Sequence, residues 1–238
     1  MTLALFRDDP YQRQAPGRVT AHTAEGGIVL DQTIFYPKGG GQPGDSGRIE
    51  WPGGAMGIAT AVKGEGRDVV LVPSEPVALP PLGADLVQTL DWERRHKHMR
   101  VHTALHLLSV VLPLPVTGGA VSAGSGRLDF DMAEPPSDRE AIETTLNDYV
   151  DRDLRVTEDW IEEAVLDANP RLVKTMTVQP PRGQGPIRLI RIGEGGGQVD
   201  LQPCGGTHVA RTGEIGRIRL GKFENKGRQN RRVTILLD

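Results

Sequence analysis

The chain has 238 residues, 37% of them hydrophobic, and a formal net charge of −3. A chain of this length and composition can fold as one large or two ordinary globular domains, and none of its apolar runs approaches the roughly 20 residues needed to span a membrane. The charge excludes a protein that is basic over its whole surface. The single cysteine excludes an internal disulfide and, with a start that has no charged leader, predicts a cytoplasmic protein in a reducing compartment.

Residues 1–90 are expected to form a small β-barrel module. They are rich in glycine and proline, and short alternating segments at 27–30, 57–62 and 68–72 are separated by turn signals. The glycine-rich stretch at 36–47 superficially resembles a phosphate-binding loop. It lacks the Gly-Lys-Ser/Thr ending of such loops and no helical pattern follows it, so we expect a shaped turn or a wall beside a substrate.

A second domain is expected over residues 91–238, because the composition changes near residue 90. A charged stretch leads there into an apolar run at 99–112, which ends at Pro113 and predicts a helix. Within this run His102 and His106 are one helical turn apart, so both imidazoles should point from the same helical face. Such a pair is one half of a metal site.

The rest of the second domain is expected to alternate helices with strands. A hairpin is predicted at 120–131, a helix follows the capping-box pattern at 137–140, and a short helix is predicted at 159–168. Strand signals follow at 187–192, 198–201, 216–220 and 232–237. The predicted fold class is therefore α+β, with a small β-barrel module followed by a two-layer α/β sandwich whose sheet is mostly antiparallel.

Cys204 and His208 supply the second half of the predicted metal site. Pro203, Gly205 and Gly206 oppose helix formation and favour a tight loop that would close over the histidine helix. One thiolate and three imidazoles suit one tetrahedral Zn²⁺ per chain better than Mg²⁺ or Ca²⁺. The candidate zinc ligands are His102, His106, Cys204 and His208.

Basic side chains gather before the histidine helix and near the C-terminus. They could form a solvated sheet edge or a footprint for backbone phosphates. Aromatic residues make up only 4% of the chain, so extensive base stacking on a sheet is not expected. The candidate phosphate contacts are Arg94, Arg95, Lys97, Arg100, Lys222, Lys226, Arg228, Arg231 and Arg232.

Three segments resemble a known family. Residues 100–108, 204–209 and 212–216 are similar to the editing domain of alanyl-tRNA synthetases and to its free-standing relatives, the AlaX alanyl-tRNA editing proteins. The editing domain of threonyl-tRNA synthetases shares the paired HxxxH and CxxxH arrangement. The glycine-rich stretch and the C-terminal segment are similar as well, so the resemblance covers nearly the whole chain. No segment resembles an aminoacylation domain, from which we expect a separate protein that acts in trans.

The resemblance implies a zinc-dependent aminoacyl-tRNA deacylase that removes serine, and in some members glycine, from tRNA(Ala). By this correspondence Thr103, Gly205 and Gly206 would line the site beside the four ligands. An aminoacyl ester is already activated, so its hydrolysis needs a positioned water and a polarised carbonyl but no ATP. Synthetase editing domains usually show Gln-Lys-Gly-Ser where this chain has Ser-Ala-Gly-Ser at 122–125, so the glutamine of the family is absent.

Selection of the serine ester requires a polar contact, because a synthetase pocket distinguishes such small side chains by only about 1–3 kcal/mol. Thr103, Thr207 and Ser122 carry hydroxyls that could make this contact. Four protein ligands usually describe a closed, structural zinc. The sequence therefore leaves open whether zinc exchanges a ligand, expands its coordination or only shapes the pocket.

Two other functions compete with editing. A metalloprotease with an HExxH motif also places two histidines one turn apart, but Thr103 stands where that motif has its glutamate base, and a cysteine ligand is foreign to it. The other alternative is a non-catalytic RNA-binding module that is stabilised by a structural zinc.

Overall fold

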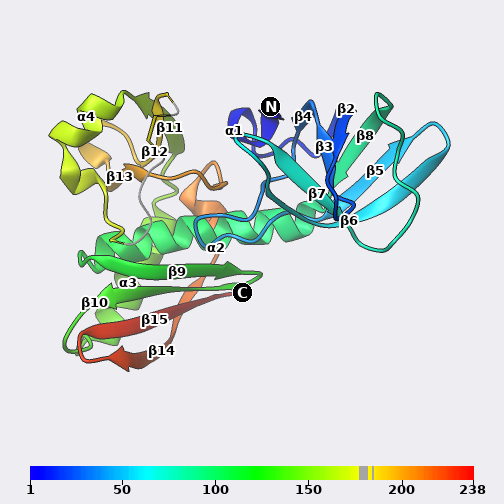
Figure 1. Ribbon diagram of the computed structural model, residues 1–238. Coiled ribbons are helices and arrows are strands. Elements are labelled where there is room, and N and C mark those ends of the chain that lie inside the picture. The colour runs from blue at the N-terminus through cyan, green and yellow to red at the C-terminus, as the bar shows by residue number, and fades with distance from the viewer. Residues whose placement is uncertain (177–181, 184) are drawn as a thin grey trace. The chain divides into compact units, whose positions relative to one another are not determined.

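The computed structural model describes residues 1–176, 182–183 and 185–238 (Figure 1). The chain divides into two compact units, Met1–Lys97 and His98–Asp238. The division falls within helix α2 (Trp92–Val111), so the charged stretch before the histidines is helical too and the helix begins earlier than predicted. Within the described ranges, none of the helices combines the length and the apolar character that a membrane crossing requires.

The first unit contains a closed antiparallel barrel in which the strands follow the order β2-β3-β7-β6-β5-β8. The barrel strands are β2 (Gln14–His22), β3 (Ile28–Leu30), β5 (Gly47–Trp51), β6 (Gly54–Lys63), β7 (Val69–Pro73) and β8 (Asp85–Leu90). The other elements are β1 (Leu3–Ala4), α1 (Leu5–Asp8) and β4 (Gln32–Thr33). Ile28, Ile49, Ile58 and Leu71 fill the barrel and are at most 2% exposed. The predicted β-barrel module is confirmed.

The glycine-rich stretch forms a tight turn in this unit. Gly39 and Gln42 exchange backbone hydrogen bonds of 3.1 and 2.9 Å, and the two glycines between them have φ values of 55° and 80°, which favour glycine. The turn is followed by the buried carboxylate of Asp45, which forms an ion pair with the buried guanidinium of Arg95. The stretch is thus a shaped turn that is fixed to the first turn of α2.

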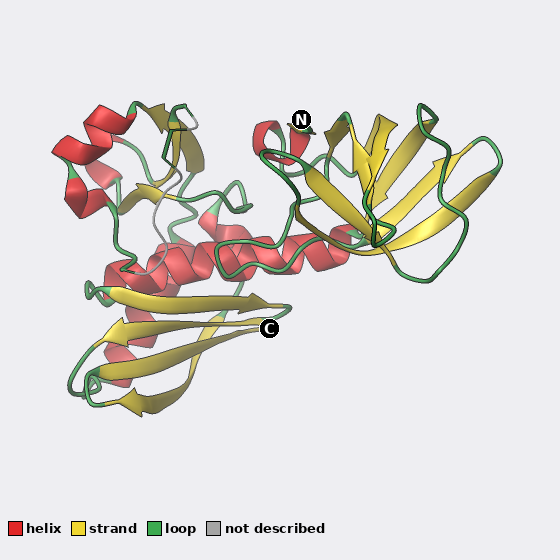
Figure 2. Cartoon of the chain, in the orientation of Figure 1, coloured by secondary structure: helices red, strands yellow, loops and turns green. Residues whose placement is uncertain are grey.

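The second unit has a four-stranded antiparallel sheet in the order β14-β15-β10-β9 (Figure 2). Its strands are β9 (Val116–Ser122), β10 (Ser125–Asp131), β14 (Ile218–Gly227) and β15 (Asn230–Leu237), and helix α3 (Arg139–Asp151) precedes the last two. Helix α2 approaches this sheet closely at Gly126. A Cβ atom there would lie 2.5 Å from Cγ1 of Val101, so glycine permits the contact that seats the histidine helix.

A smaller antiparallel sheet, β11-β12-β13, completes the second unit. It comprises β11 (Val156–Ile161), β12 (Ile187–Ile192) and β13 (Asp200–Pro203), and helix α4 (Glu163–Ala168) follows β11. Short 3-10 turns lie at Pro170–Leu172, Gly195–Gly197 and Thr212–Ile215. The helix predicted at 159–168 is wrong at its start, because Asp159 to Ile161 pair with β12. The α+β class with mostly antiparallel sheets is confirmed.

Candidate metal centre

Four side chains that could hold a metal ion meet in the second unit: His102, His106, Cys204 and His208. Their ligand atoms all lie within 4.8 Å of one another. The Sγ atom of Cys204 is 3.5 Å from Nε2 of His102 and 3.4 Å from Nε2 of His208. Zinc bonds of about 2.0–2.3 Å in a tetrahedron place sulfur and nitrogen ligands about 3.6 Å apart. The thiol and these two imidazoles thus have the spacing of zinc ligands.

Helix α2 supplies the first two of these side chains. His102 and His106 lie one turn apart, are 7% and 6% exposed, and have ring centroids separated by 5.5 Å. The neighbouring Val101 and Leu105 pack on Gly126 and so fix the rotation of the helix about its axis. This packing directs the histidine face toward the loop after β13.

The loop after β13 supplies Cys204 and His208, and Arg188 of β12 holds it in place. The Nη1 atom of Arg188 donates to the carbonyl of Cys204 at 3.0 Å and to that of Gly206 at 2.9 Å, while its Nε is bound by the carboxylate of Glu158. The backbone N–H of Gly206 donates to the Cys204 sulfur at 3.4 Å. Because Arg188 lies outside every motif of the sequence, spacing alone did not identify it.

The hydroxyl of Thr103 fixes the tautomer of His208. Its single hydrogen is donated to the carbonyl of Met99 at 2.9 Å, since a carbonyl can only accept. The same oxygen accepts from the backbone N–H of Val209 at 3.3 Å and lies 3.1 Å from Nδ1 of His208. The Nδ1 atom must therefore carry the proton, which leaves the Nε2 lone pair free for a metal.

Asp200 fixes the tautomer of His106 in the same way. This residue was not identified from the sequence. Its Oδ2 lies 3.0 Å from Nδ1 of His106, and its other oxygen accepts from Nζ of Lys174 at 2.5 Å. Nε2 of Gln202 donates to Asp200 Oδ2 at 2.7 Å and to the hydroxyl of Ser109 at 3.2 Å. A carboxylate behind a histidine ligand is a common outer partner in zinc sites. The residues present thus fit a zinc ion.

The electrostatics of the cluster favour a thiolate. Burial would raise the pKa of the Cys204 thiol, but interactions with the neighbouring imidazoles, first of all with His102, outweigh burial and bring this pKa well below 9.0. Burial, together with the charge on His102, lowers the pKa of His208 to about 3. Burial also opposes charge on His106, but the hydrogen bonds that His106 donates to Asp200 and Cys204 outweigh burial and raise the pKa of His106 to about 9. Because zinc binds thiolates and neutral imidazoles, His106 must release a proton when zinc binds.

The cluster is less deeply buried at Cys204 than at its three histidines. Cys204 is half-buried while the three histidines are buried, and Gly205 is exposed. A Cβ atom at Gly205 would meet no atom within 4 Å beyond its chain neighbours, so the loop is open to solvent at this residue. Among the other residues proposed to line the site, Thr207 is buried next to His208 and Ser122 is exposed at the end of β9.

The predicted phosphate contact of Arg95 is wrong. Its side chain is fully buried and bound to Asp45, and its remaining donors reach the carbonyls of Pro10 at 3.0 Å and Ile34 at 2.6 Å. The sequence does not reveal the burial of Arg95, because it lies in a run of charged residues and only the helical period decides which arginine faces the core. Arg95 therefore stabilises the first unit and cannot meet an RNA backbone.

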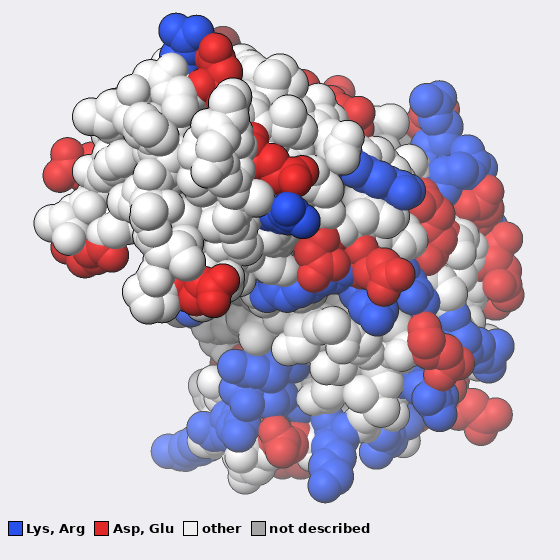
Figure 3. Space-filling view, turned by 90° about the vertical axis from the view of Figure 1, so that its right-hand side faces the viewer, with Lys and Arg blue, Asp and Glu red and all other residues white. Residues whose placement is uncertain are grey.

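The other basic candidates differ in their exposure and in their hydrogen-bond partners. The exposed ones are Lys97, Lys222, Lys226 and Arg228. Those with hydrogen bonds to backbone carbonyls are Arg94, Arg100 and Arg231. Arg232 is bound by both oxygens of Asp129, at 2.7 and 2.9 Å. In Figure 3 lysine and arginine gather in the lower part of the view, at the height that the sheet of β14 and β15 has in Figure 1.

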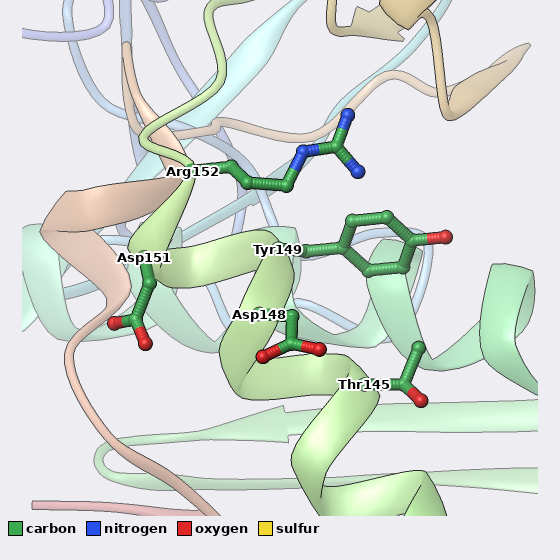
Figure 4. Close-up of a pocket in the computed structure, with 5 residues that line it drawn as sticks. All are labelled: Thr145, Asp148, Tyr149, Asp151 and Arg152. Carbon is green, nitrogen blue, oxygen red and sulfur yellow. The ribbon is translucent and has the colours of Figure 1, made fainter.

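A shallow hollow of about 510 Å³ lies on helix α3 (Figure 4). It is lined by Thr145, Asp148, Tyr149, Asp151 and Arg152. The guanidinium of Arg152 lies 5.3 Å from the ring centroid of Tyr149. None of the residues that line this hollow is a candidate ligand, so the chemistry is assigned to the His/Cys cluster.

Two family models match the chain. The family described as "Threonyl and Alanyl tRNA synthetase second additional domain" matches residues 187–234, which include Cys204 and His208. The family described as "tRNA synthetases class II (A)" matches residues 5–94, which include the barrel. Cys204 and His208 thus lie inside a region that occurs in synthetases, and His102 and His106 lie just after another such region.

Individual relatives cover the chain more completely. It is 32% identical to the alanyl-tRNA editing protein AlaX-M of Methanosarcina barkeri over 100% of this chain and 99% of that protein. It is also 32% identical to AlaX-M of Saccharolobus solfataricus, over 98% of both chains. The alanine–tRNA ligase of Pyrobaculum arsenaticum is 34% identical over 94% of this chain, which spans only 25% of the ligase. The chain therefore belongs to the AlaX-M family of alanyl-tRNA editing proteins.

Proposed function

We propose that this protein is a zinc-dependent deacylase that acts in trans and hydrolyses the ester of serine, or of glycine, on tRNA(Ala). The observation that carries the proposal is the buried cluster of three imidazoles and one thiol, whose ligand atoms lie within 4.8 Å of one another. Membership of the AlaX-M family supports the choice of an aminoacyl-tRNA as substrate. One zinc ion per chain would be held by His102, His106, Cys204 and His208.

The chemistry follows from an ester that is already activated. When bound, zinc would supply a Lewis acid that polarises the ester carbonyl or a water molecule. Thr103 and Asp200 hold His208 and His106 with Nε2 facing the cluster, so these ligands need no reorientation. Arg188 fixes the carbonyls of the Cys204 loop, and the open space beside Gly205 admits the ester. No step consumes ATP.

Discrimination between serine and alanine requires a hydrogen bond to the serine hydroxyl, since an alanine ester would leave that partner unpaired. The hydroxyl of Thr103 already makes hydrogen bonds to Met99 and Val209 and faces His208. We therefore assign Thr103 to the orientation of His208 and propose Thr207 and Ser122 for contact with the amino acid. Gly205 and Gly206 would border the same space.

The tRNA would be held by phosphate contacts from the exposed basic residues of the second unit. Lys222 and Lys226 lie on β14 and Arg228 follows it, and all three are exposed. Phosphate contacts of this kind position an acceptor stem without reading its sequence. A cytoplasmic location is part of the proposal, because a thiolate ligand such as Cys204 stays reduced there.

The test is deacylation of tRNA(Ala) charged with serine, glycine or alanine, with and without a chelator. We expect loss of the serine ester, slower loss of the glycine ester, and a stable alanine ester. Chelation should abolish turnover while circular dichroism shows that the protein remains folded. Equal rates for serine and alanine would contradict the assigned specificity. Binding of tRNA without any turnover would instead favour the RNA-binding module with a structural zinc.

A further inference from the structure

One aromatic side chain near the metal centre has no role in the proposed site. Trp160 lies on β11, an edge strand of the three-stranded sheet, and is 50% exposed, the highest value for any aromatic residue that the structure describes. Burying an indole is favourable, so one left in solvent on a sheet face is available to a partner.

The two faces of this sheet have different neighbours. On one face Ile187 and Leu189 pack against Leu166 of α4. On the other face the side chains reach the metal centre: Arg188 binds the Cys204 loop, and Gln202 and Asp200 contact Ser109 and His106 of α2. This second face is the metal-site face.

Trp160 belongs to the metal-site face. It is the register partner of Arg188 across β11 and β12, and side chains of directly paired residues share a face. Glu158, two residues away and on the same face, binds the guanidinium of Arg188. Figure 1 shows β11, β12 and β13 on the same side of α2 within this unit. The indole therefore lies on the face of the sheet that the metal ligands border.

Its distance from the thiolate follows from the sheet. The N–H of Cys204 donates to the carbonyl of Arg188 at 3.2 Å, so the ladder continues one residue past β13. Trp160, Arg188 and Cys204 then form one row across three chain segments. Adjacent strands are about 4.8 Å apart, which places the backbone of Trp160 roughly 10 Å from that of Cys204.

We propose that Trp160 is a stacking platform for the unpaired base at the 3′ end of the tRNA. This inference rests on the proposed function, since an ester held at the metal centre is joined to the terminal base through a single ribose. The base must then lie near the cluster, and the face of an exposed indole binds a base of any identity by stacking. The carboxylate of Glu158 is paired with Arg188, so the charge beside the indole is compensated. One indole suffices for one base, which agrees with the low aromatic content of the chain.

Trp160→Ala, Trp160→Leu and Trp160→Phe test the proposal on serine-charged tRNA(Ala). Loss of one stacked base should raise KM on the order of tenfold in the alanine variant and leave kcat unchanged. Leucine keeps the apolar area but lacks a planar face, so its KM should resemble that of alanine, while phenylalanine should retain most of the affinity. Val165→Ala, an exposed apolar change on α4, is the matched control and should have no effect.

A binding measurement separates this inference from the proposed function. A short uncharged RNA that ends in CCA should quench tryptophan emission in the wild type, and Trp160→Phe should remove most of that quenching. Quenching without deacylation would support the base-stacking site and contradict the editing function. Normal deacylation with an unchanged KM in Trp160→Ala would overturn the stacking site. A change from dimer to monomer in that variant with unchanged KM would also overturn it, because Trp160 would then cover an interface between copies.

Discussion

At the scale of single residues, the proposed function depends on groups that are not themselves candidate metal ligands. Thr103 and Asp200 each contact the Nδ1 side of a histidine ligand, at 3.1 and 3.0 Å, and so select the tautomer that offers Nε2. Asp200 is itself held by Lys174 and Gln202. Together these contacts would prepare the imidazoles for the proposed zinc ion and so reduce the reorganisation that binding requires.

Replacement of this carboxylate should weaken zinc binding. Asp200→Asn keeps the shape but removes the charge, and we expect the zinc affinity to fall about 10- to 100-fold. Competition with a chromophoric chelator measures this directly. Asp159→Asn is the matched control, because Asp159 is ion-paired with Arg191 in the same sheet but lies on its opposite face. An unchanged affinity in Asp200→Asn would show that the carboxylate does not support His106.

The candidate ligands could be predicted from the sequence, whereas the residues that form hydrogen bonds with them could not. His102 and His106 lie in one short motif, whereas Asp200 lies 94 residues after His106 and has no motif of its own. Only the pairing of β13 with β12 brings it to the helix. The prediction of a phosphate contact for Arg95 failed for a related reason, since a run of charged residues does not reveal which of them faces the core of the unit.

At the scale of elements, periodic segments with strong local signals were predicted well. The barrel strands β3, β6 and β7, the histidine helix and the strands β12 to β15 follow alternation or helical spacing, whereas β2, β5 and β8 were not predicted as separate strands. The start of the 159–168 segment failed, because its pairing with β12 is a long-range contact that local spacing does not record. The helix start at 137–140 was predicted as a serine capping box, but the side chain of Asp138 caps α3 by accepting from Ala141 at 2.8 Å.

The pairing of β10 with β15 predicts a pH effect. Asp129 faces Arg232 in register, and the hydrogen bond to Arg232 holds the pKa of the carboxylate below its ordinary 3.8, although burial acts the other way. A lowered folded-state pKa means that the stabilisation is complete above pH 3.8 and is lost as the pH falls through the folded-state value. Asp129→Asn should therefore lower the free energy of unfolding by about 1 kcal/mol at neutral pH.

Urea unfolding at several pH values checks this expectation. The difference between the wild type and Asp129→Asn should shrink as the pH falls below 3.8. Asp85→Asn is the control: its ion pair with Arg18 is exposed, so its removal should change stability little. A difference between wild type and Asp129→Asn that grows in acid would refute the stated role of the pair.

At the scale of the whole molecule, charge is distributed unevenly. The net charge is −3, yet exposed lysine and arginine residues gather on the second unit around β14. Such a patch attracts a polyanion although the chain as a whole is slightly acidic. We assign this patch to the tRNA backbone and the His/Cys cluster to the ester.

Removal of the patch should change binding more than chemistry. The triple variant Lys222→Ala, Lys226→Ala, Arg228→Ala is expected to weaken tRNA binding and to flatten the dependence of log Kd on log salt concentration, since fewer counterions are released. Filter binding across a salt series measures the slope, and kcat should stay unchanged. Lys38→Ala, an exposed lysine of the first unit, provides the control. If the slope of log Kd against log salt concentration is unaltered in the triple variant, the tRNA binds elsewhere on the protein.

The measurement that tests the central claim most directly is a titration of chelated, folded protein with zinc, followed by the initial rate of serine release from tRNA(Ala). The rate should rise linearly and reach its plateau at one zinc per chain, and Cys204→Ser should need far more zinc for the same rate. A serine-release rate that is high without zinc, or that does not respond to zinc in folded protein, would contradict a zinc-dependent editing site at these four side chains.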